Sequence, residues 1–254
     1  MRGLLAFTKK EWMEGIRTYK CLIILIVFLA FGFMNPIFAK YAPELMSSMM
    51  PEGMHMELPI PTVLDSWTQF FKNISQMGLI IFMLMFSGVL SNEFQKGTLI
   101  NMVTKGLSRK TILLSKTMYL IGIWTLCFGS CFLVTLGYGL MFWSEWKLAF
   151  LAFSLFCMWL FGVMLCCMLL LGSLLTRTSA GGLLLAGGSV VCFMLVQIVP
   201  NSSAYNPISL ISENMAIIKG TIAMKEIYPA IGICLLIIII TYGLSVVVFQ
   251  RKQL

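Results

Sequence analysis

The sequence has little charge and almost no histidine. Of its 254 residues 11% are charged, against about a quarter in an average soluble protein, and His55 is the one histidine. Hydrophobic residues make up 59%, and the mean hydropathy is +0.93. This composition excludes a disordered chain, a collagen, a coiled coil and an ordinary soluble enzyme, and it indicates a membrane protein.

Motifs that mark common catalytic and metal sites are also missing. The chain has no GxxxxGK[ST] phosphate loop and no HExxH zinc motif. Ionisable side chains are nearly absent from the apolar runs, which argues against a proton-driven carrier. The eight cysteines all lie in apolar runs without a CxxC pair, so packing is their expected role. We therefore predict no catalytic residue, no bound cofactor and no metal in this chain.

Six apolar runs are long enough to cross a bilayer, which takes about 20 residues each. The predicted spans are 21–39, 74–90, 115–143, 148–175, 180–199 and 227–249. The sequence thus predicts an all-α integral membrane protein with six transmembrane helices in one domain over residues 1–254.

The basic residues are distributed unevenly between the two sides of this topology. The side that holds both termini, the segment after span two and the turn after span four carries 13 of the 18 Lys and Arg residues. By the positive-inside rule this side is the cytoplasm. The excess of positive charge is thereby explained without nucleic acid as a partner, and we predict a multi-pass protein of the cytoplasmic membrane of a bacterium.

Two further segments are too polar to span. Residues 1–20 alternate apolar and charged side chains and predict an amphipathic helix lying in the cytoplasmic interface. Residues 201–226, between spans five and six, predict a short outer helical piece that begins with a turn at Asn206-Pro207.

The segment after span two is the most informative one. It runs from Glu93 through Lys96-Gly97-Thr98-Leu99 to Ser108-Arg109. Residues 94–103 predict a short helix with an apolar side, which Gly106 would end, and Ser108 is the expected N-cap of span three. A helix that packs on a soluble partner protein needs these features.

This pattern resembles the membrane subunits of type-2 ABC exporters, in which a coupling helix lies between spans two and three. The six spans, the N-terminal elbow helix, the outer segment and the closing sequence Phe249-Gln250-Arg251-Lys252 are similar to the same family. The resemblance implies a permease subunit that works as a dimer with an identical or related permease. Two copies of a separate ATP-binding subunit would bind ATP and Mg²⁺.

The resemblance also implies roles for the residues of the coupling segment, 93–110. Apolar residues would dock on the ATPase, basic residues would pair with its acids or with lipid phosphate, and Glu93 would hold the end of span two against Arg17 or Arg177. Alternatively, Lys110 and Lys116 only anchor helix ends among headgroups. The candidate residues are Glu93, Phe94, Lys96, Gly97, Thr98, Leu99, Ile100, Val103, Ser108 and Arg109.

Other features leave alternatives open. Gly181, Gly182, Gly187 and Gly188 form a small-residue face that suits either a dimer interface or packing within one subunit. The methionines and histidine of residues 46–56 suit either Cu(I) or an apolar lid. The scarcity of charge within the spans favours an amphipathic cargo such as a peptide antibiotic, a drug or a lipid-like molecule. An ATP-independent channel or carrier is the alternative function.

Overall fold

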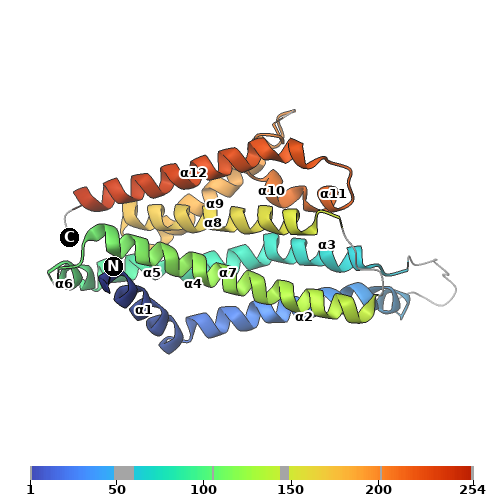
Figure 1. The fold of residues 1–254 in the computed structure, drawn as a ribbon, viewed down its shortest axis with the longest axis horizontal. Helices are drawn as coiled ribbons and strands as arrows, with labels where there is room; N and C mark the ends of the chain where they lie inside the picture. Colours follow the sequence, from blue (N-terminus) through green and yellow to red (C-terminus); the bar gives the residue numbers. More distant parts are fainter. Residues whose placement is uncertain (1, 49–59, 105, 144–148, 201, 253–254) are drawn as a thin grey trace.

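The chain folds into a bundle of long helices with both ends of the chain at the same end of the bundle (Figure 1). The structure is a computed structural model that describes residues 2–48, 60–104, 106–143, 149–200 and 202–252. It is 85% helical, and the described residues form no strand. The predicted all-α class is confirmed. The methionine-rich segment proposed for copper falls on 46–56 and lies outside the side chains that the structure describes.

Six helices are long and apolar enough to cross a membrane, which makes the chain a multi-pass membrane protein. Most of them exceed the predicted spans because polar residues extend the helices beyond the apolar runs. The observed helices are α2 (Lys20–Ser48), a composite helix from Val63 to Gln95, α7 (Arg109–Phe142), α8 (Leu151–Thr176), α9 (Ser179–Val196) and α12 (Met224–Arg251).

The composite helix differs most from the prediction of 74–90. It begins with α3 (Val63–Asn73), passes through a π-helical turn at Ile74–Gly78, and continues as α4 (Leu79–Phe86) and α5 (Gly88–Gln95). Asp65 accepts a hydrogen bond from the Thr62 backbone N–H at 2.8 Å, which completes its N-terminus. The polar residues of α3 concealed its continuity with the apolar run.

Short helices cover the two ends of the bundle. At the end with both termini lie α1 (Arg2–Arg17) and α6 (Thr98–Thr104), and at the opposite end lie α10 (Ser209–Ser212) and α11 (Asn214–Ile218) (Figure 1). Asn206 fixes the turn before α10, because its Nδ2 donates to the Phe193 carbonyl of α9 at 2.6 Å. The predicted N-terminal helix and the predicted short helical piece between spans five and six are therefore both present.

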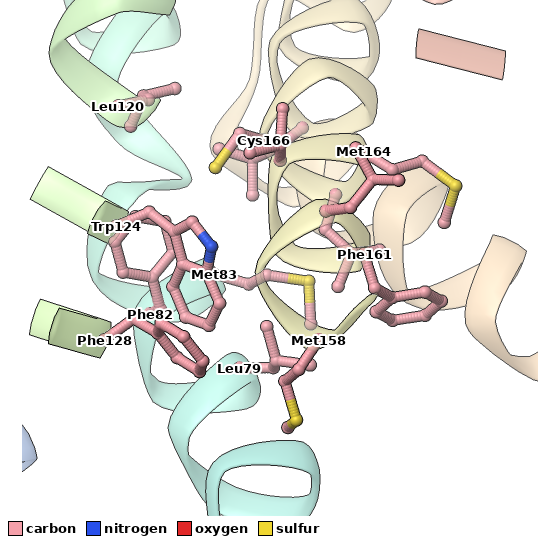
Figure 2. Close-up of a cluster of buried hydrophobic side chains, with 14 of the residues drawn as sticks. Leu79, Phe82, Met83, Leu120, Trp124, Phe128, Met158, Phe161, Met164 and Cys166 are labelled. Atoms are coloured by element: carbon pink, nitrogen blue, oxygen red, sulfur yellow. The ribbon is translucent and has the colours of Figure 1, made fainter. Parts of the chain in front are cut away.

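The core surrounds α8, the most deeply buried of the six long helices. Trp124 of α7 is fully buried, stacks on Phe128 and donates from Nε1 to the Trp159 carbonyl at 3.0 Å (Figure 2). Gly162 makes room for the indole, because a Cβ at this position would overlap the ring. By contrast α9 and α12 leave most of their apolar surface exposed, as expected for helices that face lipid or a second subunit.

A neutral polar network joins α2, α3 and α7 near the end that carries α10 and α11. Asn35 is fully buried; its Nδ2 donates to Thr135 Oγ1 at 3.2 Å, and its Oδ1 accepts from Asn73 at 2.7 Å. Thr135 in turn donates to the Gly32 carbonyl at 3.2 Å. Hydrogen bonds of this kind stabilise helix pairs in membranes by about 0.6 kcal/mol on average.

Candidate functional site

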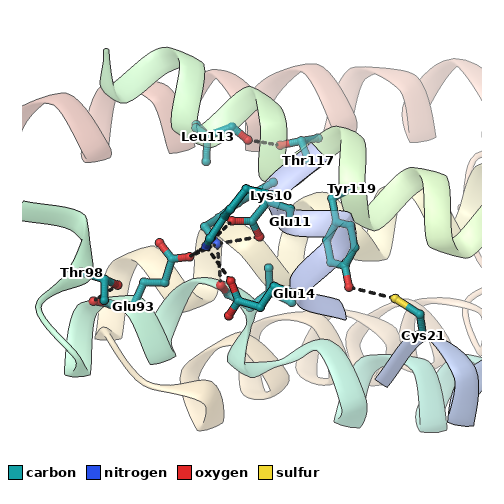
Figure 3. Close-up of polar contacts among 11 residues, drawn as sticks. Lys10, Glu11, Glu14, Cys21, Glu93, Thr98, Leu113, Thr117 and Tyr119 are labelled. Atoms are coloured by element: carbon teal, nitrogen blue, oxygen red, sulfur yellow. Dashed lines mark hydrogen bonds and ion pairs between the residues drawn. The ribbon is translucent and has the colours of Figure 1, made fainter. Parts of the chain in front are cut away.

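A cluster of five charged side chains, called the ion cluster here, joins α1, α5 and α7. It consists of Lys10, Glu11, Glu14, Glu93 and Lys116 (Figure 3). Lys116 is 1% exposed and its Nζ donates to Glu93 Oε1 at 2.8 Å, to Glu11 Oε2 at 3.1 Å and to the Val89 carbonyl at 2.9 Å. All three protons of its ammonium group therefore have acceptors.

Lys10 is the second centre of the ion cluster. Its Nζ contacts Glu14 Oε2 at 2.6 Å, Glu11 Oε1 at 3.1 Å and Glu93 Oε1 at 3.2 Å. Burial disfavours its charge, but the hydrogen bond to Glu14 and the charges of Glu11 and Glu93 outweigh burial and raise the pKa of Lys10. Burial likewise acts to raise the pKa of Glu14, and its hydrogen bond to Lys10 overrides this and lowers it. Both groups are thus held in the charged form.

The partners of Glu93 differ from the prediction. The structure pairs this carboxylate with Lys116 and Lys10 rather than with Arg17 or Arg177. Lys116 is also too deeply buried to anchor a helix end among headgroups, so that alternative is wrong for this residue. Sequence spacing gave no signal for this pairing, since α1, α5 and α7 meet only after the bundle has formed.

Two glycines enclose α6, the helix that stands where a coupling helix was predicted. Gly97 and Gly106 have φ angles of +65° and +87°, a backbone region that favours glycine. At the second end the Gly106 and Leu107 N–H groups donate to the Val103 and Met102 carbonyls, which is a Schellman motif. The predicted stop at Gly106 is present, but the continuous helix over 94–103 is not, because Gly97 separates α5 from α6.

The apolar residues predicted to dock on a partner divide into two groups. Leu99 is 1% exposed and packs into the core, and Val103 is half-buried against it. Ile100 is 47% exposed and lies on the outer side of α6 with exposed Asn101 and Thr104. The predicted docking by Leu99 is corrected to anchoring of α6 on its own chain, and Ile100 is the predicted docking residue that α6 leaves exposed.

Phe94 is likewise engaged within the chain. Its ring packs edge-to-face on Phe249 with a centroid distance of 6.1 Å, and the charged groups of Arg177 and Lys252 lie within 6 Å of its centre. The Phe94 side chain therefore holds the end of α5 against the end of α12 instead of forming part of a docking surface.

Arg109 and Ser108 organise the start of α7. The Ser108 hydroxyl accepts from the Thr111 N–H at 3.1 Å, which confirms the predicted N-cap. The Arg109 guanidinium donates to the carbonyls of Phe249 and Gln250 at 2.9 Å and of Lys252 at 2.6 Å. It satisfies carbonyls that the end of α12 leaves without helical partners, so the expected pairing of Arg109 with a partner's acids is not needed to explain it.

Lys96 and Thr98 lie next to the ion cluster. Lys96 is exposed, and the Thr98 hydroxyl reaches the Glu93 carbonyl at 3.4 Å. Both side chains, with the ion cluster, line a polar cavity of about 430 Å³. This cavity, the charged cavity below, lies beside α1 at the end of the bundle that carries both termini.

The glycines of α9 also fall into two groups. Gly181 and Gly182 are buried against α8, where added Cβ atoms would overlap Thr176 and approach Ser173, so they serve packing within one subunit. Gly187 and Gly188 have nothing within 4 Å of an added Cβ and remain candidates for a dimer interface. An apolar cavity of about 560 Å³ adjoins Gly187 between α4, α8 and α9, with Ser75, Gln76, Gln197 and Ser212 in its wall.

Comparison with known proteins supports the membrane assignment. No family model matches the chain. A relative that is 26% identical over 148 residues is the uncharacterized transmembrane protein YxlG of Bacillus subtilis strain 168. The matched region covers 56% of this chain and 54% of the relative, so the chain spans about half the length of the relative. The chain is therefore similar to a transmembrane protein, in agreement with its six candidate spans.

Proposed function

We propose that the chain is the permease subunit of an ATP-driven ABC exporter of the cytoplasmic membrane of a bacterium. The observation that carries this proposal is the build of α6. This helix is held on its own chain by buried Leu99, is set off by two positive-φ glycines, and presents Ile100 outward. These are the properties that a helix needs if it is to receive a partner protein without unfolding the bundle.

The residues around α6 connect it to several spans. The carboxylate of Glu93, which lies in α5 five residues before the start of α6, binds Lys116 of α7 and Lys10 of α1. Arg109, shortly after α6, holds the end of α12. A displacement of α6 by an ATPase that closes on ATP and Mg²⁺ would therefore reach α1, α7 and α12 through ionic and hydrogen-bonded contacts.

Orientation and cargo follow from the charge distribution. The end with both termini and α6 is rich in Lys and Arg, which favours the cytoplasmic side, where ATP is available. The apolar cavity between α4, α8 and α9 has few polar groups in its wall and suits an amphipathic cargo. A second permease, identical or related, would complete the path against the exposed faces of α9.

Purification from the native cell in mild detergent, followed by mass spectrometry, tests the proposal. A stoichiometric ATP-binding subunit is expected with the unmodified chain. Ile100→Glu should abolish its retention, because the substitution places a charge on the outer face of α6. Leu175→Glu is the matched control, since Leu175 is exposed to a similar degree at the same end but lies on α8.

Retention of the ATPase by Ile100→Glu would remove α6 as the docking helix. A stable, pure complex without any ATP-binding subunit would contradict the exporter and support an ATP-independent channel or carrier.

A further inference from the structure

The charged cavity is not filled by the contacts described so far. Its volume of about 430 Å³ lies within the range of small-molecule sites. It opens beside α1, whose side chains Leu5, Met13 and Ile16 are exposed and apolar. Because such a helix lies at the membrane interface, the cavity is at the level of lipid headgroups.

The ion cluster in this cavity has more negative than positive charge. Two ammonium groups, of Lys10 and Lys116, face the three carboxylates of Glu11, Glu14 and Glu93. Glu93 is 9% exposed, and its Oε2 atom is buried without a hydrogen-bond partner among the described residues. A buried carboxylate oxygen without a donor is costly, and Glu93 lines the cavity, so an additional N–H group placed at this carboxylate would remove that cost.

Two further lysines line the same cavity and do not belong to the ion cluster. Lys96 is exposed at the end of α5, and Lys20 is half-buried at the start of α2. An ammonium group of this kind binds phosphate as a point charge. The cavity therefore combines an acceptor for a protonated amine with two cations for an anion.

We propose that the charged cavity binds a phosphoethanolamine group, with its primary ammonium at Glu14 and Glu93 and its phosphate at Lys20 and Lys96. The position at headgroup level indicates phosphatidylethanolamine of the surrounding membrane as the source. A primary ammonium group has three N–H donors, whereas the trimethylammonium group of phosphatidylcholine has none and prefers aromatic faces. Selection of the ethanolamine headgroup over choline is the distinctive expectation.

Native mass spectrometry of the full chain in detergent micelles tests this directly. The probes are dioleoyl phosphatidylethanolamine, dioleoyl phosphatidylcholine and dioleoyl phosphatidylglycerol, with water-soluble phosphoethanolamine and inorganic phosphate as separate arms. We expect phosphatidylethanolamine to bind about tenfold more tightly than the other two lipids, the effect of roughly one charge-assisted hydrogen bond. Equal binding of the three lipids would overturn the proposal.

Substitutions at the exposed members of the site keep the fold intact. Glu14→Gln should reduce the affinity for phosphatidylethanolamine to that for phosphatidylcholine, and Lys96→Gln should weaken both lipids together. Lys9→Gln is the matched control, because Lys9 is exposed on α1 but does not line the cavity. Unchanged selectivity in Glu14→Gln would overturn the assignment of the ammonium subsite.

The soluble arms identify the source of the ligand. Selective binding of phosphoethanolamine without acyl chains, sensitive to Glu14→Gln, would keep the site and assign it to a water-soluble ligand. Binding of inorganic phosphate at the same affinity as phosphoethanolamine would overturn the ammonium subsite. These measurements require no ATPase, so their outcome is independent of the proposed exporter function.

Discussion

The two ends of α7 bury polar side chains in different ways. Near its start Lys116 lies among carboxylates, and near its end Thr135 lies in a network of neutral amides and hydroxyls. Both residues are about 10 Å from an end of the helix, given a rise of about 1.5 Å per residue. Distance from the helix end therefore does not decide between charged and neutral groups.

The difference comes from the elements that cover each end. At the start of α7, α1 and the end of α5 bring carboxylates to Lys116 from outside the apolar runs. At the other end the network is formed by the spanning helices α2, α3 and α7, and it contains amides and hydroxyls. A charge is thus buried where short or terminal segments supply its counter-charge, as desolvation requires.

Removal of the charge of Lys116, near the start of α7, should cause the largest loss of stability. Lys116→Met keeps the length of the side chain but leaves Glu11 and Glu93 buried without this partner. We expect a loss of about 3–5 kcal/mol in the free energy of unfolding, measured by chemical unfolding in mixed micelles. Lys110→Met, at an exposed position of the same helix, should change stability by less than about 0.5 kcal/mol. Equal losses in the two variants would contradict a structural role for the ion cluster.

Between its two polar regions α7 packs on α8 through Trp124 and Gly162. A substitution at this contact measures how much stability depends on packing without charges or hydrogen bonds. Gly162→Ala places a methyl group against the Trp124 indole, and such overpacking costs about 1–3 kcal/mol. Gly129→Ala on α7 has open space around its Cβ and should be neutral or stabilising. Thermal unfolding followed by tryptophan fluorescence compares them, and tolerance of Gly162→Ala would show that α7 and α8 can separate.

Disruption of the neutral network should cost less stability than either Lys116→Met or Gly162→Ala. Thr135→Val removes the hydroxyl that joins Asn35 to Gly32, at an expected cost of about 0.6 kcal/mol. In the control Thr241→Val the lost hydroxyl donates within its own helix, to Ile237 at 2.7 Å, so the loss should be smaller. A loss for Thr135→Val as large as that for Lys116→Met would remove the contrast between the two ends.

The pair of Lys10 and Glu14, at the exposed edge of the ion cluster, should contribute least to the free energy of unfolding. Its contribution should also depend on pH. The coupling between Lys10 and Glu14, obtained from a double-mutant cycle with Lys10→Gln and Glu14→Gln, should be about 0.3–0.5 kcal/mol at neutral pH. Because the pKa of Glu14 is lowered from 4.5, this coupling is lost as the pH falls through that lowered pKa. Because the pKa of Lys10 is raised from 10.5, it persists to strongly alkaline pH. A coupling that is constant in acid would show that the pair does not act through charge.

Much of the fold could be predicted from the sequence, since hydropathy and helix signals are local. The six spans, the helix at residues 2–17, the stop at Gly106 and the cap at Ser108 all follow from short stretches of sequence. The start of the second span at Val63 was missed, because Asp65, Lys72 and other polar residues of α3 hide its helix behind a low local hydropathy.

The candidate site could be predicted only in part. Glu93 and α6 were identified from their sequence pattern, but the partners of Glu93 were not. Lys10 and Glu93 lie 83 positions apart, and Glu11 and Lys116 lie 105 apart. Contacts over such separations depend on how helices pack. The inward orientation of Leu99 and Phe94 could not be predicted for the same reason. The sequence of an amphipathic helix indicates its apolar side but not which part of the protein covers that side.

The position of Arg109 has a consequence for the number of independent movements available to the bundle. Its guanidinium fixes the start of α7 to the end of α12, while Glu93 fixes the end of α5 to α1 and α7. Four segments that are distant along the chain therefore share few degrees of freedom at this end. The opposite end, joined by the neutral contacts of Asn35 and Thr135, retains more of them, so we expect the separation between helices to vary more easily there than at the end that carries the ion cluster.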